Sequence, residues 1–178
     1  LDLGNNWIDT SAAYGLGHSE EMVGKAIQGK RYQVIIATKC SLIWDGRTDG
    51  TVGHRLKAWS VRKEAENSLK RLGVDVIDLY QIHWPNPEEE IEEGWAEIAR
   101  LVEEGKVRYG GVSNFSVEQI KKVQKIHPVA SAQPQYSMLE RSPEKELLEY
   151  CDQQKIGVIV YSPMASGLLT GKYNRETV

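Results

Sequence analysis

Residues 77–83 of the chain, IDLYQIH, are a short run of strand-forming residues that lies between two helical patterns. Before this run, a helix is predicted to begin at Ser60 and to stop at Gly73. Its apolar stripe consists of Val61, Ala65, Leu69 and Leu72. After the run, a second helical pattern extends from the Pro87–Glu90 region to Gly105. A strand set between two helices is the repeating unit of a parallel α/β sheet.

The same unit recurs in both directions along the chain. Five further runs have the length of a buried parallel strand: Trp7–Ser11, Val34–Lys39, Arg108–Asn114, Ser131–Ser137 and Gly157–Pro163. Three more helices are predicted, with starts at Ser19, at Ser116, and at Ser142 followed by Pro143. For the first of them, which Gly29 closes, the residues expected on the apolar face are Met22, Val23, Ala26 and Ile27.

Regular alternation of strand and helix has two usual solutions, an open doubly wound sheet or a closed (β/α)8 barrel. Gly110-Gly111 follows a strand, but no G-x-G-x-x-G opens a helix and no P-loop occurs. The pattern therefore favours the barrel. About six strand-helix units are visible, so we expect residues 1–178 to form a single domain that lacks its first strand and its last strand-helix unit. Because the first residue is Leu1, we expect a piece of a longer protein.

The amino-acid composition gives no support for a nucleic acid, a membrane or a metal ion as a partner. The formal net charge is -3, and positive and negative side chains alternate along the predicted helices, which is typical of a solvated surface and not of a nucleic-acid binder. No apolar run approaches the roughly 20 residues that a bilayer requires, so no membrane partner and a cytoplasmic location are expected. Cys40 and Cys151 lack the spacing of metal ligands, and no metal site is predicted. A homo-oligomer is left open.

Polar residues gather where the predicted strands end. The residues concerned are Asp9, Lys39, His83, Ser113 with Asn114, Gln133 with Gln135, and Tyr161 with Ser162. Barrel enzymes build their active sites at the carboxyl ends of the strands, so these side chains are expected at one mouth of the barrel. The stretch Cys40–Trp59 is long for a connection and rich in polar residues, and we expect it to overhang the same cleft.

Four of these polar positions suggest a proton-transfer device. A buried Lys39 needs an anionic partner, and Asp9 on the neighbouring strand is the obvious one. Because a phenol titrates near ~10 in isolation, the Lys39 charge is expected to stabilise the phenolate of Tyr14. His83 would donate to a carbonyl oxygen. Taken singly, Asp9 could cap a turn, Lys39 could extend to solvent, and His83 could be a core histidine. Together they suit carbonyl reduction.

The ordered motifs resemble those of the aldo-keto reductases. The matching segments are residues 8–15 (IDTSAAYG), 37–39 (ATK), 78–85 (DLYQIHWP), 105–115 (GKVRYGGVSNF) and 160–173 (VYSPMASGLLTGKY). The resemblance implies a (β/α)8 barrel that binds NADP(H) without a Rossmann fold and reduces aldehydes or ketones. It also implies a catalytic tetrad of Asp9, Tyr14, Lys39 and His83, in which Tyr14 is the general acid.

The resemblance further assigns cofactor contacts. It implies that Asp9 borders the cofactor, that Ser113, Asn114 and Gln133 hold the nicotinamide carboxamide, and that Tyr161 stacks on the ring. The residues that resemble the segment along the pyrophosphate are Ser162, Met164, Ser166, Gly167, Leu168 and Lys172. For these the alternative is a plain loop.

The resemblance leaves two questions open. Tyr14, Trp44, His83 and Trp84 are candidate walls of the substrate pocket, although Trp84 could instead belong to the core. The chain is also similar to the potassium-channel β subunits, which gives the alternative of a cofactor-sensing regulatory or binding module with little turnover. His83 favours the enzyme.

Overall fold

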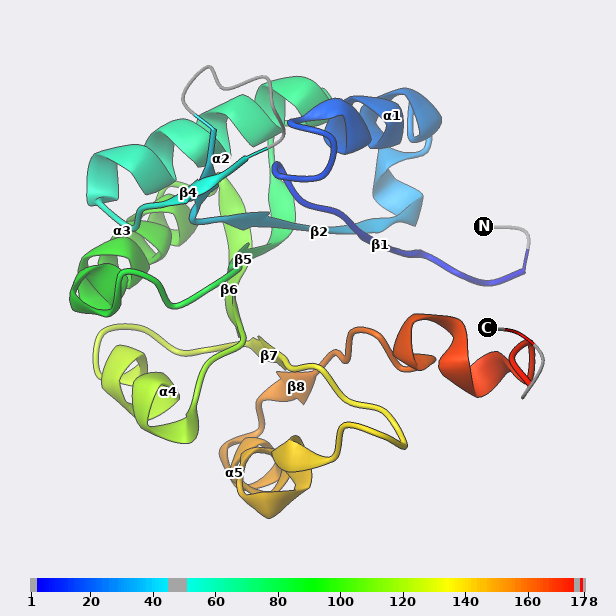
Figure 1. Cartoon of the computed structure of the whole chain (residues 1–178). Coiled ribbons are helices and arrows are strands. Elements are labelled where there is room, and N and C mark those ends of the chain that lie inside the picture. The colour runs from blue at the N-terminus through cyan, green and yellow to red at the C-terminus, as the bar shows by residue number, and fades with distance from the viewer. Residues whose placement is uncertain (1–2, 45–50, 175–176, 178) are drawn as a thin grey trace.

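The chain folds around one parallel sheet that curls into half of a barrel (Figure 1). The computed structural model describes residues 3–44, 51–174 and 177. The sheet contains, in spatial order, β1 (Trp7–Asp9), β2 (Ile35–Cys40), β5 (Ile77–Ile82), β6 (Val107–Ser113), β7 (Ser131–Gln133) and β8 (Gly157–Val158). Each strand pairs in parallel with the next, so all the carboxyl ends lie at the same edge.

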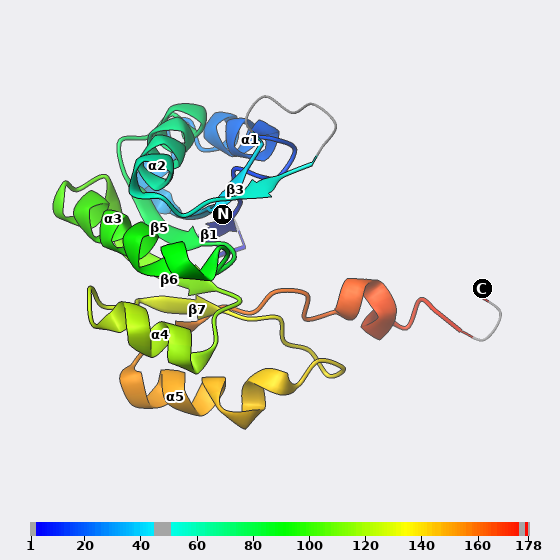
Figure 2. The ribbon, with the colours of Figure 1, turned by 60° about the vertical axis from the view of Figure 1, so that its left-hand side comes forward.

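Helices cover the convex face of this sheet (Figures 1 and 2). Within the described residues they are α1 (His18–Ala26), α2 (Ala58–Leu72), α3 (Ile91–Glu103), α4 (Val117–Gln124) and α5 (Leu147–Gln154). Short 3₁₀ helices occupy Arg31–Gln33, Glu88–Glu90, Ser142–Lys145 and Ala165–Thr170, the last labelled η4. No helix in the described part of the chain has the length and hydropathy that crossing a membrane would require.

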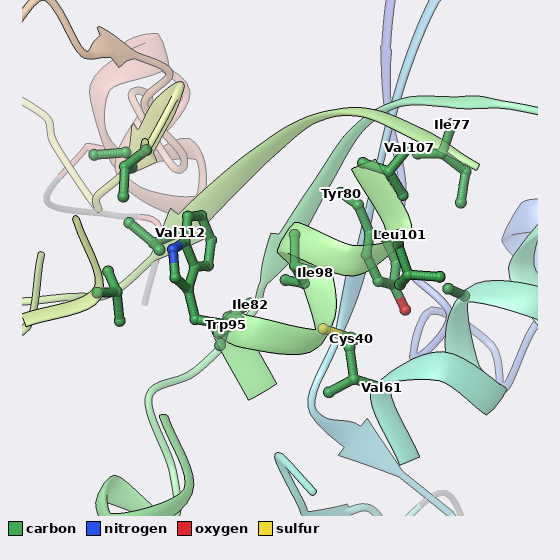
Figure 3. Packing of buried hydrophobic residues seen from close by; sticks show 14 of the residues in the cluster. Cys40, Val61, Ile77, Tyr80, Ile82, Trp95, Ile98, Leu101, Val107 and Val112 are labelled. Atoms are coloured by element: carbon green, nitrogen blue, oxygen red, sulfur yellow. The ribbon is translucent and has the colours of Figure 1, made fainter. Parts of the chain in front are cut away.

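The core lies between the sheet and the helices (Figure 3). Trp95 and Ile98 of α3 are fully buried, and a β-carbon added to Gly110 of β6 would lie 3.0 Å from each of them. On the other face of the strand, a β-carbon at Gly111 would lie 2.4 Å from the hydroxyl oxygen of Ser131. Gly110 and Gly111, which are not part of a dinucleotide-binding motif, therefore allow close packing on the two faces of β6.

The six predicted strands are all present in the predicted order, but β1 ends at Asp9 instead of Ser11, and the last two strands are shortened further. The run Ser131–Ser137 was expected to be one strand, whereas β7 ends at Gln133 because Pro134 has no N–H to donate to a ladder. Beyond it, only an isolated bridge joins Gln135 to Tyr161. The run Gly157–Pro163 was also expected to be one strand, but β8, which pairs with the short β7, contains only Gly157–Val158.

Helix ends were predicted with mixed success. Gly73 ends α2 in the left-handed conformation, with φ 65°, and Ser116 caps α4 in a capping box with Gln119, as predicted. Ser19 does not cap α1: it lies inside the helix, and its hydroxyl meets that of Thr10 at 2.8 Å.

Two further expectations about helices were wrong. Ser142–Pro143 begins a 3₁₀ turn, and α5 itself begins at Leu147, because Glu146 has a non-helical φ of -151°. In α1, Met22 and Ala26 are exposed, and only Ile27 of the expected apolar face is buried while Val23 is half-buried. The physical reason is that α1 packs through a charged residue instead.

Glu20 is the buried contact that holds α1 against the rest of the fold. Its side chain is fully buried, and one carboxylate oxygen accepts a 2.6 Å hydrogen bond from the Thr38 hydroxyl of β2. The other oxygen accepts a 2.6 Å bond from Nε of Arg71 at the end of α2. A single carboxylate thereby joins α1, β2 and α2, and Val23 and Ile27 add apolar packing against the core.

Replacing Glu20 with Ala should lower the free energy of unfolding by about 3 kcal/mol, because it leaves the buried Thr38 hydroxyl and the Arg71 guanidinium without their partner. The matched control is Glu21→Ala, which removes an exposed carboxylate from the same helix turn and should cost less than about 1 kcal/mol. Urea unfolding followed by circular dichroism measures both. Equal losses in the two variants would contradict the account.

Candidate active site

Lys39 lies at the centre of the site because of the alternation of side chains along β2. Its neighbours Thr38 and Cys40 face the helices, where Thr38 bonds to Glu20 and Cys40 joins the core cluster. Successive residues of a strand point to opposite faces, so Lys39 points to the concave face of the sheet. There its side chain is only 1% exposed.

The buried ammonium of Lys39 is held by two short contacts. Its Nζ donates to Oδ2 of Asp9 at 2.9 Å and to the backbone oxygen of Thr10 at 2.8 Å. The other Asp9 oxygen accepts a 3.3 Å bond from Nε2 of Gln133. The expected ion pair between Lys39 and Asp9 is therefore present, and it is reinforced by a carbonyl and an amide that the sequence did not single out for this purpose.

Tyr14 and His83 lie next to this ion pair. Nζ of Lys39 is 5.3 Å from the centre of the Tyr14 ring. The Tyr14 and His83 rings are 5.9 Å apart between centroids and nearly perpendicular, at 80°. The four residues predicted to form one group, from three strand ends and one loop, are thus brought together.

Ser11 orients the imidazole of His83, a role that the sequence reasoning missed. Its hydroxyl oxygen lies 3.3 Å from Nδ1 of His83 and accepts a 3.2 Å bond from the backbone N–H of Ala13. The hydroxyl can donate to Nδ1, and in that tautomer the imidazole proton is on Nε2. The position of Ser11, two residues beyond Asp9 at the same strand end, is the signal that could have revealed it.

Burial and charge keep His83 neutral. Burial, followed by the positive charge of Lys39, lowers the pKa of His83 to about 4 against the opposing effect of Asp9. Burial likewise lowers the pKa of Lys39, although its carboxylate partner acts to raise it. A neutral imidazole near pH 7 can donate one N–H to an acceptor without bringing a second full positive charge beside Lys39.

The expected stabilisation of the Tyr14 phenolate is not found. The pKa of Tyr14 is raised, first by partial burial and then by the negative charge of Asp9 and by Tyr161. Since Asp9 pairs directly with Lys39, the ammonium is largely compensated where the phenol lies. Tyr14 is therefore a neutral phenol that holds its proton firmly at neutral pH.

A second network lies beside the first and contains the predicted carboxamide-binding residues. The Ser113 hydroxyl donates to the backbone oxygen of Gln133 at 2.8 Å. The Asn114 amide nitrogen donates to the backbone oxygen of His83 at 2.9 Å and lies 3.1 Å from the Ser113 hydroxyl oxygen. The Tyr161 hydroxyl donates to the Asn114 amide oxygen at 2.8 Å. These residues thus form a hydrogen-bonded network that reaches the backbone of His83, just after β5.

The two tryptophans predicted as pocket walls lie in different places. Trp84 is 42% exposed and lines a groove together with Asn114 and Tyr161, next to the site. Trp44 lines another pocket with Trp59 and Arg71, beneath the connection that follows β2. The Trp44 pocket also includes Ala12, two residues before Tyr14, so both tryptophans stay predictions as walls of the substrate pocket.

The connection Cys40–Trp59 contains a small antiparallel hairpin, β3 (Leu42–Ile43) and β4 (Gly53–His54). The charge of His54 contributes to lowering the pKa of His83, so this end of the hairpin lies near the site. Residues 45–50 of the same connection, on which part of the expected overhang depended, lie outside the described residues.

The residues predicted to follow the pyrophosphate lie on the segment that contains η4. Figure 2 shows this segment extending away from the sheet and from the strand ends that carry the catalytic group. Its backbone is left-handed at Ser162, Ser166 and Gly167, with φ of 52°, 54° and 98°. Met164, Leu168 and Lys172 are exposed. None of these side chains joins the group around Lys39.

Sequence comparison identifies relatives along the whole chain. A family model described as "Aldo/keto reductase family" matches residues 1–178. The chain is 47% identical over 178 residues to aldo-keto reductase YhdN of Bacillus subtilis, which covers 99% of the chain and 53% of that protein. It is 39% identical to the NADH-specific methylglyoxal reductase of Escherichia coli, over 98% of the chain and 57% of that protein.

Solved structures agree with the sequence comparison. The glycerol dehydrogenase of Gluconobacter oxydans superposes with a TM-score of 0.95 at 43% identity, over 99% of the chain and 55% of the enzyme. An aldo-keto reductase of Klebsiella pneumoniae, solved in complex with NADPH, gives a TM-score of 0.79 at 31% identity, over 96% of the chain and 57% of that protein. The chain thus spans about half the length of the relatives that it matches.

Replacing Lys39 with Met should raise the pKa of His83 above about 4, because the ammonium no longer repels the imidazolium and Asp9 is no longer paired. The titration of the His83 ring, followed by NMR of its imidazole nitrogens, measures this change. Lys25→Met, which removes an exposed lysine from α1, should leave the His83 titration unchanged. A His83 pKa that stays at about 4 in Lys39→Met would show that the two groups are not coupled.

Proposed function

Because this chain belongs to the aldo/keto reductase family, we propose that it carries the catalytic group of an enzyme that reduces small aldehydes or ketones with a nicotinamide cofactor. One observation carries the proposal. A buried ammonium paired with Asp9 lies 5.3 Å from the ring of Tyr14, and a neutral imidazole lies 5.9 Å from the same ring. A proton donor (Tyr14), a hydrogen-bond donor (His83) and a fixed positive charge (Lys39) thus lie next to one another.

The residues beside this group fit a nicotinamide carboxamide, which requires both donors and acceptors. The Asn114 amide oxygen accepts one bond from Tyr161 and retains a second lone pair. Gln133 is almost fully buried, and its amide makes only a long 3.3 Å bond to Asp9. Ser113, Asn114 and Gln133 would hold the carboxamide, and the Tyr161 ring would lie against the nicotinamide. The cofactor, when bound, would supply the hydride.

The proton chemistry belongs to the chain's own residues. Tyr14 would donate its proton to the carbonyl oxygen as that oxygen gains negative charge, and its raised pKa keeps the proton in place at neutral pH until then. An alkoxide is far more basic than a phenolate, so the donation does not require a lowered pKa. Asp9 keeps Lys39 in position beside the Tyr14 ring and compensates much of its charge, so the basicity of the alkoxide drives the proton transfer.

His83 would act on the same oxygen without giving up a proton. With its ring proton on Nε2, it can donate a hydrogen bond that orients the carbonyl and stabilises the developing charge. Burial and the nearby charge of Lys39 both disfavour protonation of His83, so the imidazole is neutral when it donates. The four residues would thus divide proton donation, charge stabilisation and orientation among them.

We propose NADPH as the preferred cofactor. The NADPH complex of the Klebsiella relative supports this choice, and the exposed Lys172, on a segment rich in left-handed backbone, would meet the pyrophosphate. The Escherichia coli relative is NADH-specific, so a side-by-side assay with NADH belongs to the test. Both cysteines are free and buried, which fits a reducing compartment such as the cytoplasm.

Catalysis is favoured over a purely regulatory role. The relatives and structures described above carry the names of reductases and dehydrogenases. A neutral His83 beside Tyr14 supports catalysis, because a module that only binds cofactor would not need a hydrogen-bond donor there. Turnover of NADPH with a reactive aldehyde such as methylglyoxal distinguishes the two functions.

Tyr14→Phe should lower kcat by roughly 10²- to 10⁴-fold, because it removes the proton donor and leaves the ring in place. Cofactor affinity, measured by quenching of protein fluorescence, should change little, since the phenol is assigned to the substrate carbonyl. Loss of NADPH absorbance in the presence of aldehyde measures the rate.

The control for this substitution is Tyr32→Phe, which removes the hydroxyl from a tyrosine that is 98% exposed. It should leave kcat unchanged. If Tyr14→Phe and Tyr32→Phe both retain the full rate, Tyr14 is not the general acid. If the unaltered protein turns over no carbonyl with either cofactor, the regulatory alternative is favoured.

A further inference from the structure

Ser41, directly after β2, has an unusual backbone that three contacts hold in place. Its φ is 86°, a value that L-residues rarely adopt and that requires support from the surroundings. Its N–H donates to Oε2 of Glu64 on α2 at 2.9 Å, and its backbone oxygen accepts a 3.1 Å bond from the N–H of Arg55. Its side-chain oxygen accepts a 3.2 Å bond from the N–H of Trp84.

This corner connects two of the catalytic strand ends. Ser41 lies two residues after Lys39, and the backbone oxygen of Cys40 accepts a 3.0 Å bond from the N–H of His83. Residues 40 and 41 thus hold the backbone N–H groups of residues 83 and 84, the first through a backbone oxygen and the second through a side-chain oxygen. Any change in the conformation of Ser41 would move the point at which His83 and Trp84 leave β5.

Glu64 is well placed to fix that conformation. Its other oxygen accepts a 3.1 Å bond from the Ser60 hydroxyl one turn earlier on α2, which keeps the carboxylate aimed at the Ser41 N–H. Burial raises the pKa of Glu64 to about 7, against the opposing charges of Arg55 and Arg71. A carboxyl group is costly to bury, and the bond to the strained backbone of Ser41 gives it a function.

We propose that Glu64 is a positioning residue of the active site: by accepting the Ser41 N–H it holds the corner after β2 and thereby aligns His83 and Trp84 with the substrate carbonyl. The catalytic part of this inference rests on the proposed reductase function. The geometric part does not, because it concerns where the His83 ring lies whether or not the protein turns over substrate.

The test compares two replacements of Glu64 with a matched control. Glu64→Met keeps the length of the side chain and removes both acceptor oxygens, whereas Glu64→Gln keeps one acceptor for the Ser41 N–H. Glu66→Met makes the same change on α2 at a carboxylate that is 44% exposed and pairs with Lys106. The readouts are kcat, the KM for NADPH and aldehyde, and the NMR signals of the His83 imidazole.

Glu64→Met should lower kcat at least about tenfold, because small displacements of a positioned group are costly in rate, and should change the KM for NADPH less than about twofold. Its His83 imidazole signals should shift. Glu64→Gln should recover kcat to within about threefold of the unaltered protein. Glu66→Met should leave kcat and the His83 signals as they are.

Unshifted His83 signals in folded Glu64→Met would overturn the inference, and so would a Gln variant as slow as the Met variant. If Glu64→Met does not fold, Ser60→Ala tests the same link, because it removes the hydroxyl that holds the Glu64 carboxylate in position toward the Ser41 N–H. The His83 signals must shift there too, or the inference fails. If the unaltered protein shows no turnover, the proposed function fails, and the NMR comparison alone decides the inference.

Discussion

The buried ion pair between Lys39 and Asp9 is the interaction on which the rest of the site depends. An ammonium that is 1% exposed is tolerated only where an anion and further acceptors replace its water, and Asp9 and the Thr10 carbonyl do so at 2.9 and 2.8 Å. Its charge then acts on its neighbours. It helps to keep His83 neutral, and it lies 5.3 Å from the centre of the Tyr14 ring.

The half-barrel makes this pair possible by bringing the ends of parallel strands together. Asp9 ends β1 and Lys39 lies near the end of β2, and the two strands pair directly in register. Alternation along β2 sends Lys39 to the concave face while Thr38 reaches back to Glu20 on α1. The convex face is thus fixed by helices and a buried carboxylate, and the concave face is left for chemistry.

Much of this arrangement could be predicted from the sequence. The strand runs, the stop at Gly73 and the cap at Ser116 follow from local patterns, and the pairing of Lys39 with Asp9 follows from the cost of burying a lysine. The packing of α1 could not be predicted in this way, because periodicity counts apolar residues and the buried contact is Glu20.

Properties that depend on distances between segments were also beyond the sequence. The raised pKa of Tyr14 results from its burial and from how near Asp9 lies, and neither can be obtained from spacing. Ser11 and Glu64 gain their importance from single contacts, with His83 and with Ser41, across 72 and 23 residues of chain. Only the folded chain shows which atom each of them meets.

Lys39 and Asp9 stabilise each other as a unit, and a double-mutant cycle with Lys39→Met and Asp9→Asn measures that coupling. The free energies of unfolding of the four proteins, from urea titrations, give the coupling. The account predicts that the double variant costs less than the sum of the single variants by at least about 1.5 kcal/mol, because each single variant leaves a buried partner unpaired. Costs that add within about 0.5 kcal/mol would contradict it.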